Sequence, residues 1–350
     1  MLYSIHLCRA IAALLVVLFH SAGNLAKEKY FGILALPLEQ IFWFGGQVGV
    51  DFFFVLSGFV MYYVHRKDFD HPERLASYAR KRVTRIYPTY IILFVGVYLL
   101  AKLIPALQNS VPSDMGVIIK SLLLLPQDKQ VVGGTGAPVI VAAWSLQYEM
   151  LFYSVFALAL IRRWMLWTAA VILGVNLLAQ FISGPYGFPR NFLASHAIVL
   201  FAFGILAAAA ARSKIVVNFP GRLVLISLFV FGGFVLLSVL NRDSYNPLFD
   251  LCYGLTSAIL IFGLVRYENK KGQIDAAKRL SIYGDSSYAL YLLHFPLIAI
   301  LSKISILVLP LNLAGVLIAF IFLVTSSVFA GVVFHLLIEK PILRRLSSWA

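Results

Sequence analysis

The amino-acid sequence predicts an all-α integral membrane protein with about ten transmembrane helices. Of its 350 residues, 61% are hydrophobic and only 13% are charged, whereas about 25% of the residues in a soluble domain are charged. The apolar residues form runs of about 20, the length that a helix needs to cross ~30 Å of hydrocarbon. The 29 Lys and Arg residues lie mostly in the breaks between these runs, so they indicate membrane topology and not a nucleic-acid surface.

Each run that is long enough to cross the bilayer is taken as one span. In chain order the predicted spans are 2–22, 47–65, 86–104, 138–161, 165–182, 194–211, 222–240, 248–266, 282–303 and 312–337. Residues 115–126 are apolar but too short to cross, so we expect a re-entrant or interfacial segment there. The first run resembles a signal peptide, but its charge lies within the apolar stretch and the following chain is equally apolar, so we expect it to be retained.

The basic residues predict that both chain termini are cytoplasmic. With that orientation the inner loops carry 20 Lys and Arg residues and the outer side carries 8, with Arg242 among the outer ones. Every pair of loops then obeys the positive-inside rule. No repeat of fixed period and no low-complexity linker divides the chain, so we expect a single domain over residues 1–350.

The sequence offers neither a metal site nor a phosphate-binding loop. Cys8 and Cys252 both fall within apolar runs, which leaves no disulfide framework and no CxxC motif, and no metal is expected. The glycine-rich segment 133–136 is too short and too poor in lysine for a P-loop. We therefore interpret it as an outer loop.

Arg9 and His20 stand eleven residues apart in the first span. Eleven residues make about three helical turns, so both side chains share one face roughly 16 Å apart. Charged residues inside a span usually face a protein interior and serve a function. The predicted topology places Arg9 toward the cytoplasm and His20 toward the outside.

Two carboxylates fall at the same predicted depth as His20. Asp51 opens the second span from the outside, and Glu149 lies near the outer end of the fourth. A neutral imidazole accepts a proton from a hydroxyl when a second group orients its other nitrogen, and either carboxylate is suited to that task. Structural hydrogen bonding between helices would account for each carboxylate equally well. For His20 taken alone, the alternative is a buried histidine bonded to a backbone carbonyl.

The ninth predicted span carries a polar stripe. Gly284, Ser287, Tyr291 and His294 recur at spacings of three and four residues, which places them on one helix face. Pro296 removes a backbone hydrogen bond just after His294, so we expect a kink there. The stripe is interpreted either as the lining of a cavity or as contacts between helices.

Arginines also precede the third span. Arg82 and Arg85 lie three residues apart, just before Pro88 in the expected first turn of that helix. Guanidinium groups bind phosphate through paired hydrogen bonds, so the two arginines suit a cytoplasmic donor that carries phosphates. The positive-inside rule by itself also explains arginines at this place.

The chain resembles acyltransferase family 3, whose polytopic members O-acylate bacterial surface and secreted glycans. The matching motifs are Arg9-X10-His20, Gly49 to Phe59 with Asp51 and Ser57-Gly58, Arg82-Val-Thr-Arg85-Ile-Tyr-Pro88, Trp144-Ser145-Leu146-X-X-Glu149 with Phe152-Tyr153, Gly284-X-X-Ser287-Tyr288 through Tyr291-Leu292-X-His294, and Glu339-Lys340-Pro341. They occur in the family's order and cover almost the whole chain. The first two blocks are most similar to exopolysaccharide O-acetyltransferases of the succinoglycan type.

The resemblance implies a donor and an acceptor. Acetyl-CoA or another acyl-CoA would be the cytoplasmic co-substrate, with no tightly bound cofactor, and Arg82, Arg85 and Arg9 would hold it. His20 would be the general base, oriented by Glu149 or Asp51. The acceptor would be the hydroxyl of an exopolysaccharide, a lipopolysaccharide or a lipid-linked oligosaccharide, reached from the bacterial inner membrane.

Further residues of the matching motifs are expected to line the substrate cavity or support it. They are Ser57, Trp144, Ser145, Tyr291 and His294. The chain carries no SGNH hydrolase-like domain, which some family members use to complete the transfer, so the resemblance implies a single-module enzyme. A covalent acyl-imidazole on His20 is the less favoured variant of the reaction.

Two other classes of protein also place charges inside a membrane. A transporter or flippase for a glycan or lipid-linked sugar would do so along its substrate pathway. Its usual signs, inverted repeats and interrupted helices in matching halves, are not evident in the sequence. A membrane scaffold that binds an acyl chain or a sugar without turnover is the third alternative.

Overall fold

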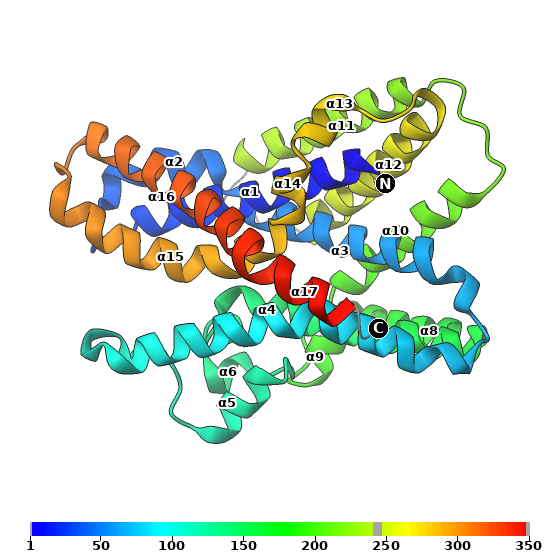
Figure 1. The fold of residues 1–350 in the computed structure, drawn as a ribbon, viewed down its shortest axis with the longest axis horizontal. Coiled ribbons are helices and arrows are strands. Elements are labelled where there is room, and N and C mark those ends of the chain that lie inside the picture. The colour runs from blue at the N-terminus through cyan, green and yellow to red at the C-terminus, as the bar shows by residue number, and fades with distance from the viewer. Residues whose placement is uncertain (1, 241–246, 348–350) are drawn as a thin grey trace. The chain divides into compact units, whose positions relative to one another are not determined.

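The computed structural model describes residues 2–240 and 247–347, and in these ranges the chain is helical and forms no strand (Figure 1). Ten helical stretches among these residues are long and apolar enough to cross a membrane. In the most apolar window of Arg163–Ser183, 0% of the residues are buried, so this helix needs a lipid environment. The predicted all-α membrane fold is therefore confirmed.

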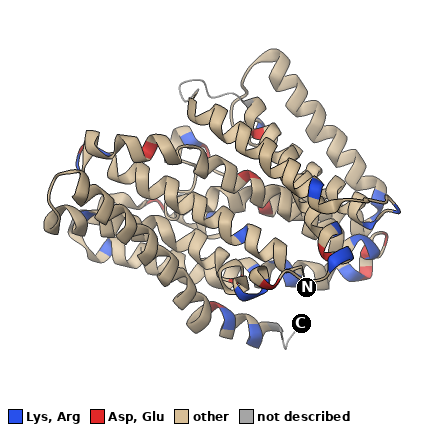
Figure 2. Cartoon of the chain, turned by 90° about the horizontal axis from the view of Figure 1, so that it is seen from above, with Lys and Arg blue, Asp and Glu red and all other residues tan. Residues whose placement is uncertain are grey.

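Charged residues are sparse along the membrane-spanning helices. Lys and Arg lie mainly in the loops and at the helix ends, while long helical stretches carry neither sign of charge (Figure 2). This is the distribution expected of transmembrane segments. Arg242, assigned from the sequence to an outer loop, lies outside the described residues.

The helices group into two compact units. The first unit comprises Met1–Tyr63 and Leu200–Leu336, and the second comprises Val64–Val199 and Leu337–Ala350. A compact unit defined by its internal contacts is not by itself a separate domain. The single domain over residues 1–350 therefore stays a prediction.

The first unit is a bundle of long helices joined by short ones. The helices that lie wholly or mostly in it are α1 (Tyr3–Leu25), α2 (Leu36–Phe42), α3 (Phe44–His65), α10 (Ala197–Arg212), α11 (Pro220–Leu240), α12 (Pro247–Lys271), α13 (Asp275–Arg279), α14 (Ser281–Asp285), α15 (Ser287–Val308) and α16 (Leu313–Phe334). Helix α11 packs on α12 and α15 packs on α16, while α1 contacts α14, α15 and α16. Helix α1 is thus central to this unit.

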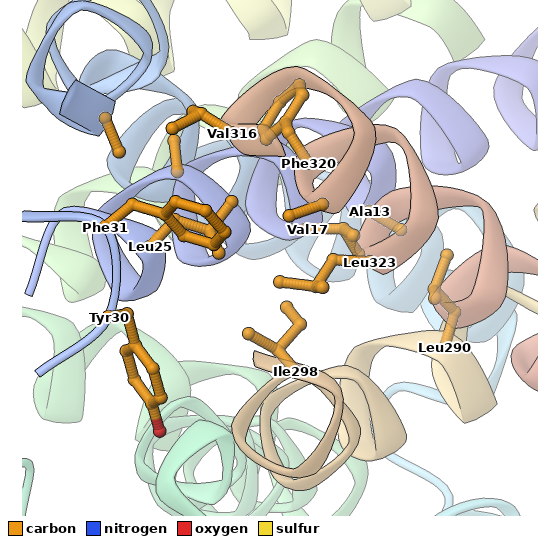
Figure 3. Close-up of a cluster of buried hydrophobic side chains, with 13 residues drawn as sticks. Ala13, Val17, Leu25, Tyr30, Phe31, Leu290, Ile298, Val316, Phe320 and Leu323 are labelled. Atoms are coloured by element: carbon orange, nitrogen blue, oxygen red, sulfur yellow. The ribbon is translucent and has the colours of Figure 1, made fainter. Parts of the chain in front are cut away.

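A buried apolar cluster joins α1 to α15 and α16 (Figure 3). Val17 of α1, Leu290 and Ile298 of α15, and Leu323 of α16 are each at most 5% exposed. Fully burying one such side chain contributes about 1.5–3 kcal/mol. This cluster fixes the faces that α1 and α15 present to each other.

Close approach of α3 to its neighbours depends on glycine. A Cβ added at Gly49 would lie 2.6 Å from the carbonyl oxygen of Ala12 on α1, and one added at Gly204 of α10 would collide with the carbonyl of Val55 on α3. Contacts of this kind between small residues let membrane helices pack backbone to backbone. The block from Gly49 to Phe59 therefore serves packing as well as any chemistry.

The second unit holds the remaining helices. They are α4 (Leu75–Leu103), α5 (Met115–Leu122), α6 (Lys129–Val132), α7 (Trp144–Ile161), α8 (Arg163–Ser183), α9 (Arg190–Leu193) and α17 (Lys340–Ser347). Helix α7 packs on α8 and on α4, and α17 packs on α4. The apolar segment 115–126 forms the short helix α5, and it is not among the ten candidate spans in the described part of the chain.

Ionic and hydrogen-bonding contacts also secure the loop after α3. Asp70 accepts hydrogen bonds from the backbone N–H of Arg163, at 2.7 Å, and from its Nε, at 2.5 Å. These bonds hold the pKa of the Asp70 carboxyl below its usual range, and the bond from the backbone N–H has the largest effect. The loop is thereby attached to the first turn of α8.

Several helix boundaries differ from the sequence prediction, and two of the differences concern residues of the matching motifs. Helix α4 begins at Leu75, so Pro88 lies in its interior and not in its first turn. The predicted span 282–303 is divided at Ser286 into α14 and α15. The side chains of Ser286 and Ser287 bond the carbonyls of Tyr283 and Gly284, and such local bonds compete with the helical ladder.

We predict that Gly204→Ala destabilises the protein. Alanine in place of glycine inside a helix ordinarily gains about 0.5–1 kcal/mol, but at Gly204 the new methyl group collides with the Val55 carbonyl, and overpacking costs about 1–3 kcal/mol. The thermal unfolding midpoint of the detergent-solubilised protein should fall. The matched control is Gly174→Ala in α8, where an added Cβ meets nothing within 4 Å; equal midpoints for the two variants would refute the packing argument.

Candidate active site

His20 lies in the last two turns of α1, held by two hydrogen-bonding partners. Its Nδ1 is 2.9 Å from the carbonyl oxygen of Val16, one turn earlier, and 3.3 Å from Nε2 of His294 on α15. His294 is fully buried, whereas His20 is half-buried. The two imidazoles, 274 positions apart in the chain, are brought together by the packing of α1 on α15.

The carbonyl partners assign the protons on both rings. Nδ1 of His294 lies 3.2 Å from the carbonyl oxygen of Leu290. A carbonyl only accepts, so this nitrogen carries the proton of the neutral ring and its Nε2 is an acceptor. Nδ1 of His20 likewise faces the Val16 carbonyl and donates to Val16 and to His294. The lone pair of neutral His20 is therefore on Nε2, the nitrogen that a general base needs.

Aromatic rings surround the two imidazoles. Phe295 lies edge-on to His20 at 5.4 Å between ring centroids, and Tyr291 is 5.9 Å from His294. Phe53 of α3 packs edge-on against Tyr291 at 5.8 Å. Tyr291 and His294 were both expected at the site, so the structure brings two other predicted residues close to His20.

Asp51 is buried in α3, where its neighbours include two polar side chains. It accepts a hydrogen bond from Nε2 of Gln47, one turn earlier, at 3.0 Å. Asp250 of α12 is also buried and lies near enough for the two carboxyl charges to interact. The role of Asp51 in orienting His20 stays a prediction, as do the roles of the half-buried Ser57 and Arg9.

Glu149 has a tyrosine partner in the second unit. The Tyr153 hydroxyl, one turn further along α7, donates to Oε1 of Glu149 in a short hydrogen bond. The Tyr78 hydroxyl of α4 donates to the backbone carbonyl of Tyr153 at 2.9 Å. The predicted pairing of Glu149 with His20 joins residues of different units and stays a prediction.

Arg82 lies in the same cluster. Its guanidinium carbon is 5.6 Å from the centroid of the Tyr153 ring and 5.9 Å from that of Tyr78, in cation–π range. Its Nη2 donates to Nε2 of His65 at 3.0 Å. The sequence indicated an inner position for Arg82 and an outer one for Glu149, yet both contact Tyr153, which lies near the middle of α7.

Arg85 and the first turn of α7 have structural partners of their own. Nη1 of Arg85 lies 3.8 Å from Oε1 of Glu339, whose side chain is 0% exposed. Glu339 belongs to the last of the matching motifs, and the helix does not end there, because the π-helical turn His335–Glu339 is followed directly by α17. At the start of α7, Trp144 lies edge-on to Tyr148 at 6.1 Å, and Ser145 donates to the carbonyl of Ala142 at 3.1 Å.

Sequence reasoning missed several residues of these clusters. Gln47 and His65 were not expected at a site, and Tyr153 belonged to a matching motif but was given no role. Each lies three or four residues from a partner: Asp51, Asp68 and Glu149, respectively. Residues at these spacings are neighbours on a helix surface. The spacing was thus a usable signal for the bonds within one helix, but not for those between helices.

The assembled groups define the available chemistry. Among residues 2–240 and 247–347, no group of three or more His, Cys, Asp or Glu side chains is placed to hold a metal ion. The first unit offers an oriented imidazole, and the second offers arginines set among aromatic and acidic side chains. These groups are suited to proton transfer and to anion binding.

The match of a family model defines the class to which this helical membrane protein belongs. The family model of the acyltransferase domain, Acyl_transf_3, matches residues 2–335. The chain therefore belongs to acyltransferase family 3, as the motifs indicated, and is a multi-pass membrane O-acyltransferase. Neither a transporter nor a scaffold without turnover describes this class.

Two curated relatives agree with the family assignment. The chain is 30% identical over 309 residues to the exopolysaccharide production protein ExoZ of Rhizobium meliloti (strain 1021), across 86% of this chain and 90% of the relative. It is 25% identical over 310 residues to the acyltransferase MdmB of Streptomyces mycarofaciens, across 79% and 75%. No solved structure matches the chain.

We predict that Tyr153→Phe destabilises the second unit. The substitution keeps the ring beneath Arg82 but removes the hydroxyl that donates to Glu149, and losing one partner of a buried hydrogen bond costs roughly 1–3 kcal/mol. The unfolding midpoint in detergent should fall. Tyr98→Phe is the matched control on α4, since Tyr98 contacts Phe94 and Lys102 through its ring; a similar loss there would contradict the assigned role of the Tyr153 hydroxyl.

Proposed function

We propose that the protein transfers an acetyl group from cytoplasmic acetyl-CoA, or a related acyl-CoA, to a hydroxyl of a cell-surface or secreted polysaccharide. The observation that carries this proposal is the proton assignment at His20, which leaves a basic nitrogen on an oriented ring. The relative named for exopolysaccharide production supports a glycan acceptor. The positive-inside pattern of a multi-pass protein supports the bacterial inner membrane, with both termini cytoplasmic.

His20 acts as the general base in the proposed reaction. Its Nε2 removes the proton of the acceptor hydroxyl while the hydroxyl oxygen bonds to the thioester carbonyl carbon. The carbon–sulfur bond then breaks, and the departing thiolate takes the proton from the imidazolium. The products are the acyl ester and free CoA, and His20 returns to its neutral form.

His294 holds His20 in the required tautomer. Its Nε2 accepts from Nδ1 of His20, and its own Nδ1 is committed to the Leu290 carbonyl. Asp51 and Glu149 are retained as further orienting groups. Direct transfer is favoured over an acyl-imidazole on His20, since an oriented base needs no covalent step.

The arginines bind the donor in this proposal. Arg82 and Arg85, with Arg9, contact the phosphates or the pantetheine arm of acyl-CoA, which is a co-substrate and not a resident cofactor. Guanidinium groups suit phosphate because they donate two parallel hydrogen bonds. Ser57, Trp144, Ser145 and Tyr291 line or support the cavity for the acceptor, which is an exopolysaccharide, a lipopolysaccharide or a lipid-linked oligosaccharide.

We predict that His20→Ala abolishes most of the transfer. The purified protein in liposomes is given acetyl-CoA labelled in the acetyl group and a bacterial exopolysaccharide, and label in the polysaccharide is counted. Loss of a general base lowers the rate by about 10²–10⁴-fold. The control is His71→Ala, which removes an exposed imidazole paired with Glu73; wild-type transfer by His20→Ala would refute the base, and solute uptake without any transfer would refute the enzyme.

We predict that His294→Leu lowers kcat by a smaller factor than His20→Ala. The substitution removes one acceptor of the His20 Nδ1 proton, while the Val16 carbonyl keeps the other, so the loss stays below the about 10²–10⁴-fold expected for the base itself. The same label-transfer assay gives kcat. An equal loss in the two variants would instead place His294 among the groups that touch the substrate.

A further inference from the structure

An imidazole–carboxylate pair at the end of α3 has no role of its own in the proposed reaction. Nδ1 of His65 is 2.8 Å from Oδ2 of Asp68, three residues later. The His65 side chain is 6% exposed and that of Asp68 is 31% exposed. This pair belongs to the second unit, where its other neighbour is Arg82.

The partners of His65 assign its proton. A guanidinium only donates hydrogen bonds, so Nε2 of His65, 3.0 Å from Nη2 of Arg82, must be the acceptor. The proton is therefore on Nδ1 and is donated to Asp68. A carboxylate that accepts from one side of an imidazole polarises the ring and strengthens its other nitrogen as an acceptor. Asp68, His65 and Arg82 thus form a directed chain of two hydrogen bonds.

Aromatic packing restricts both members of the second bond. The ring of Tyr78 lies edge-on to His65 at 5.2 Å between centroids. Arg82 is in cation–π range of Tyr78 and of Tyr153. With His65 buried and Arg82 flanked by two rings, few rotamers of Arg82 keep all three contacts.

Arg82 nevertheless retains an unused donor. Its Nε is buried and has no hydrogen-bond acceptor among the described residues. A buried donor without a partner costs free energy, so an anionic oxygen that reached it would form a strong charge-assisted hydrogen bond. The side chain as a whole is half-buried and not sealed inside the unit.

We propose that His65, oriented by Asp68, is a positioning residue that holds Arg82 for the phosphates of the acyl donor. The inference rests on the proposed function in one respect, the donor-binding role of Arg82. It adds that the affinity for the donor depends on two residues that do not touch it. If His65 had only a structural role, its substitution would change the stability of the protein but not the extent to which donor affinity depends on Arg82.

The test measures CoA binding to the full-length protein in detergent by isothermal titration calorimetry. The variants are His65→Leu, Arg82→Ala and the double substitution, with His71→Leu as the matched control, because His71 pairs with Glu73 at 2.8 Å on the surface. We expect His65→Leu to raise the Kd for CoA by about tenfold, the equivalent of one charge-assisted hydrogen bond. His71→Leu should leave the Kd within about twofold.

The double substitution decides whether His65 acts through Arg82. If it does, His65→Leu has no further effect once Arg82 is alanine, whereas independent effects would multiply. His65→Gln keeps both a carbonyl acceptor and an N–H donor and should restore much of the affinity. Asp68→Asn, a half-exposed position, tests the chain from its other end and should raise the Kd even if His65→Leu does not fold.

The outcomes distinguish a failure of the positioning role of His65 from a failure of the donor-binding role of Arg82. Weaker binding in Arg82→Ala with unchanged binding in folded His65→Leu and Asp68→Asn would overturn the positioning role and leave the proposed function standing. Multiplying effects in the double substitution would do the same. Unchanged CoA binding in Arg82→Ala would overturn the donor role of Arg82 and the positioning role with it.

Discussion

Within membrane-spanning helices, each polar side chain must find its partners in the protein, because lipid provides none. His20 on α1 meets this constraint with the carbonyl of Val16 from its own helix and with His294 from α15. The second partner is available only while α1 and α15 keep their packing. The apolar cluster of Val17, Leu290, Ile298 and Leu323 fixes that packing, so the apolar core of the first unit determines the proton arrangement at the imidazole.

The second unit satisfies the same constraint for arginine. Arg82 is held by His65 and by two tyrosine rings, and Arg85 lies near the buried carboxylate of Glu339. Each contact makes an arginine less costly inside the helical bundle, and each also restricts its motion. A charged group already fixed in position loses less conformational entropy when it binds an anion. In the proposed function, the contacts that satisfy the charge of each arginine therefore also hold it ready for the donor.

Small residues permit these arrangements. Gly49 and Gly204 let α3 approach α1 and α10 backbone to backbone, and Asp51 lies on α3 two residues after Gly49. A family motif such as the block from Gly49 to Phe59 thus combines residues required for close packing with polar residues that the packing buries. The same holds for the last motif, where the buried Glu339 lies beside Arg85 in a π-helical turn that continues directly into α17.

The sequence by itself determined the all-helical membrane fold and the family, and it singled out His20 as the candidate base, because apolar length, loop charge and helical phase are local properties that survive without tertiary contacts. It also placed His294, Tyr291 and Arg82 among the site residues. Only the tertiary structure decided that His294 is the partner of His20, that Glu149 bonds Tyr153, and that His65 holds Arg82. Contacts between helices depend on how each helix is rotated and how closely it approaches its neighbours, and these follow from side-chain packing along the whole interface, which no single motif encodes.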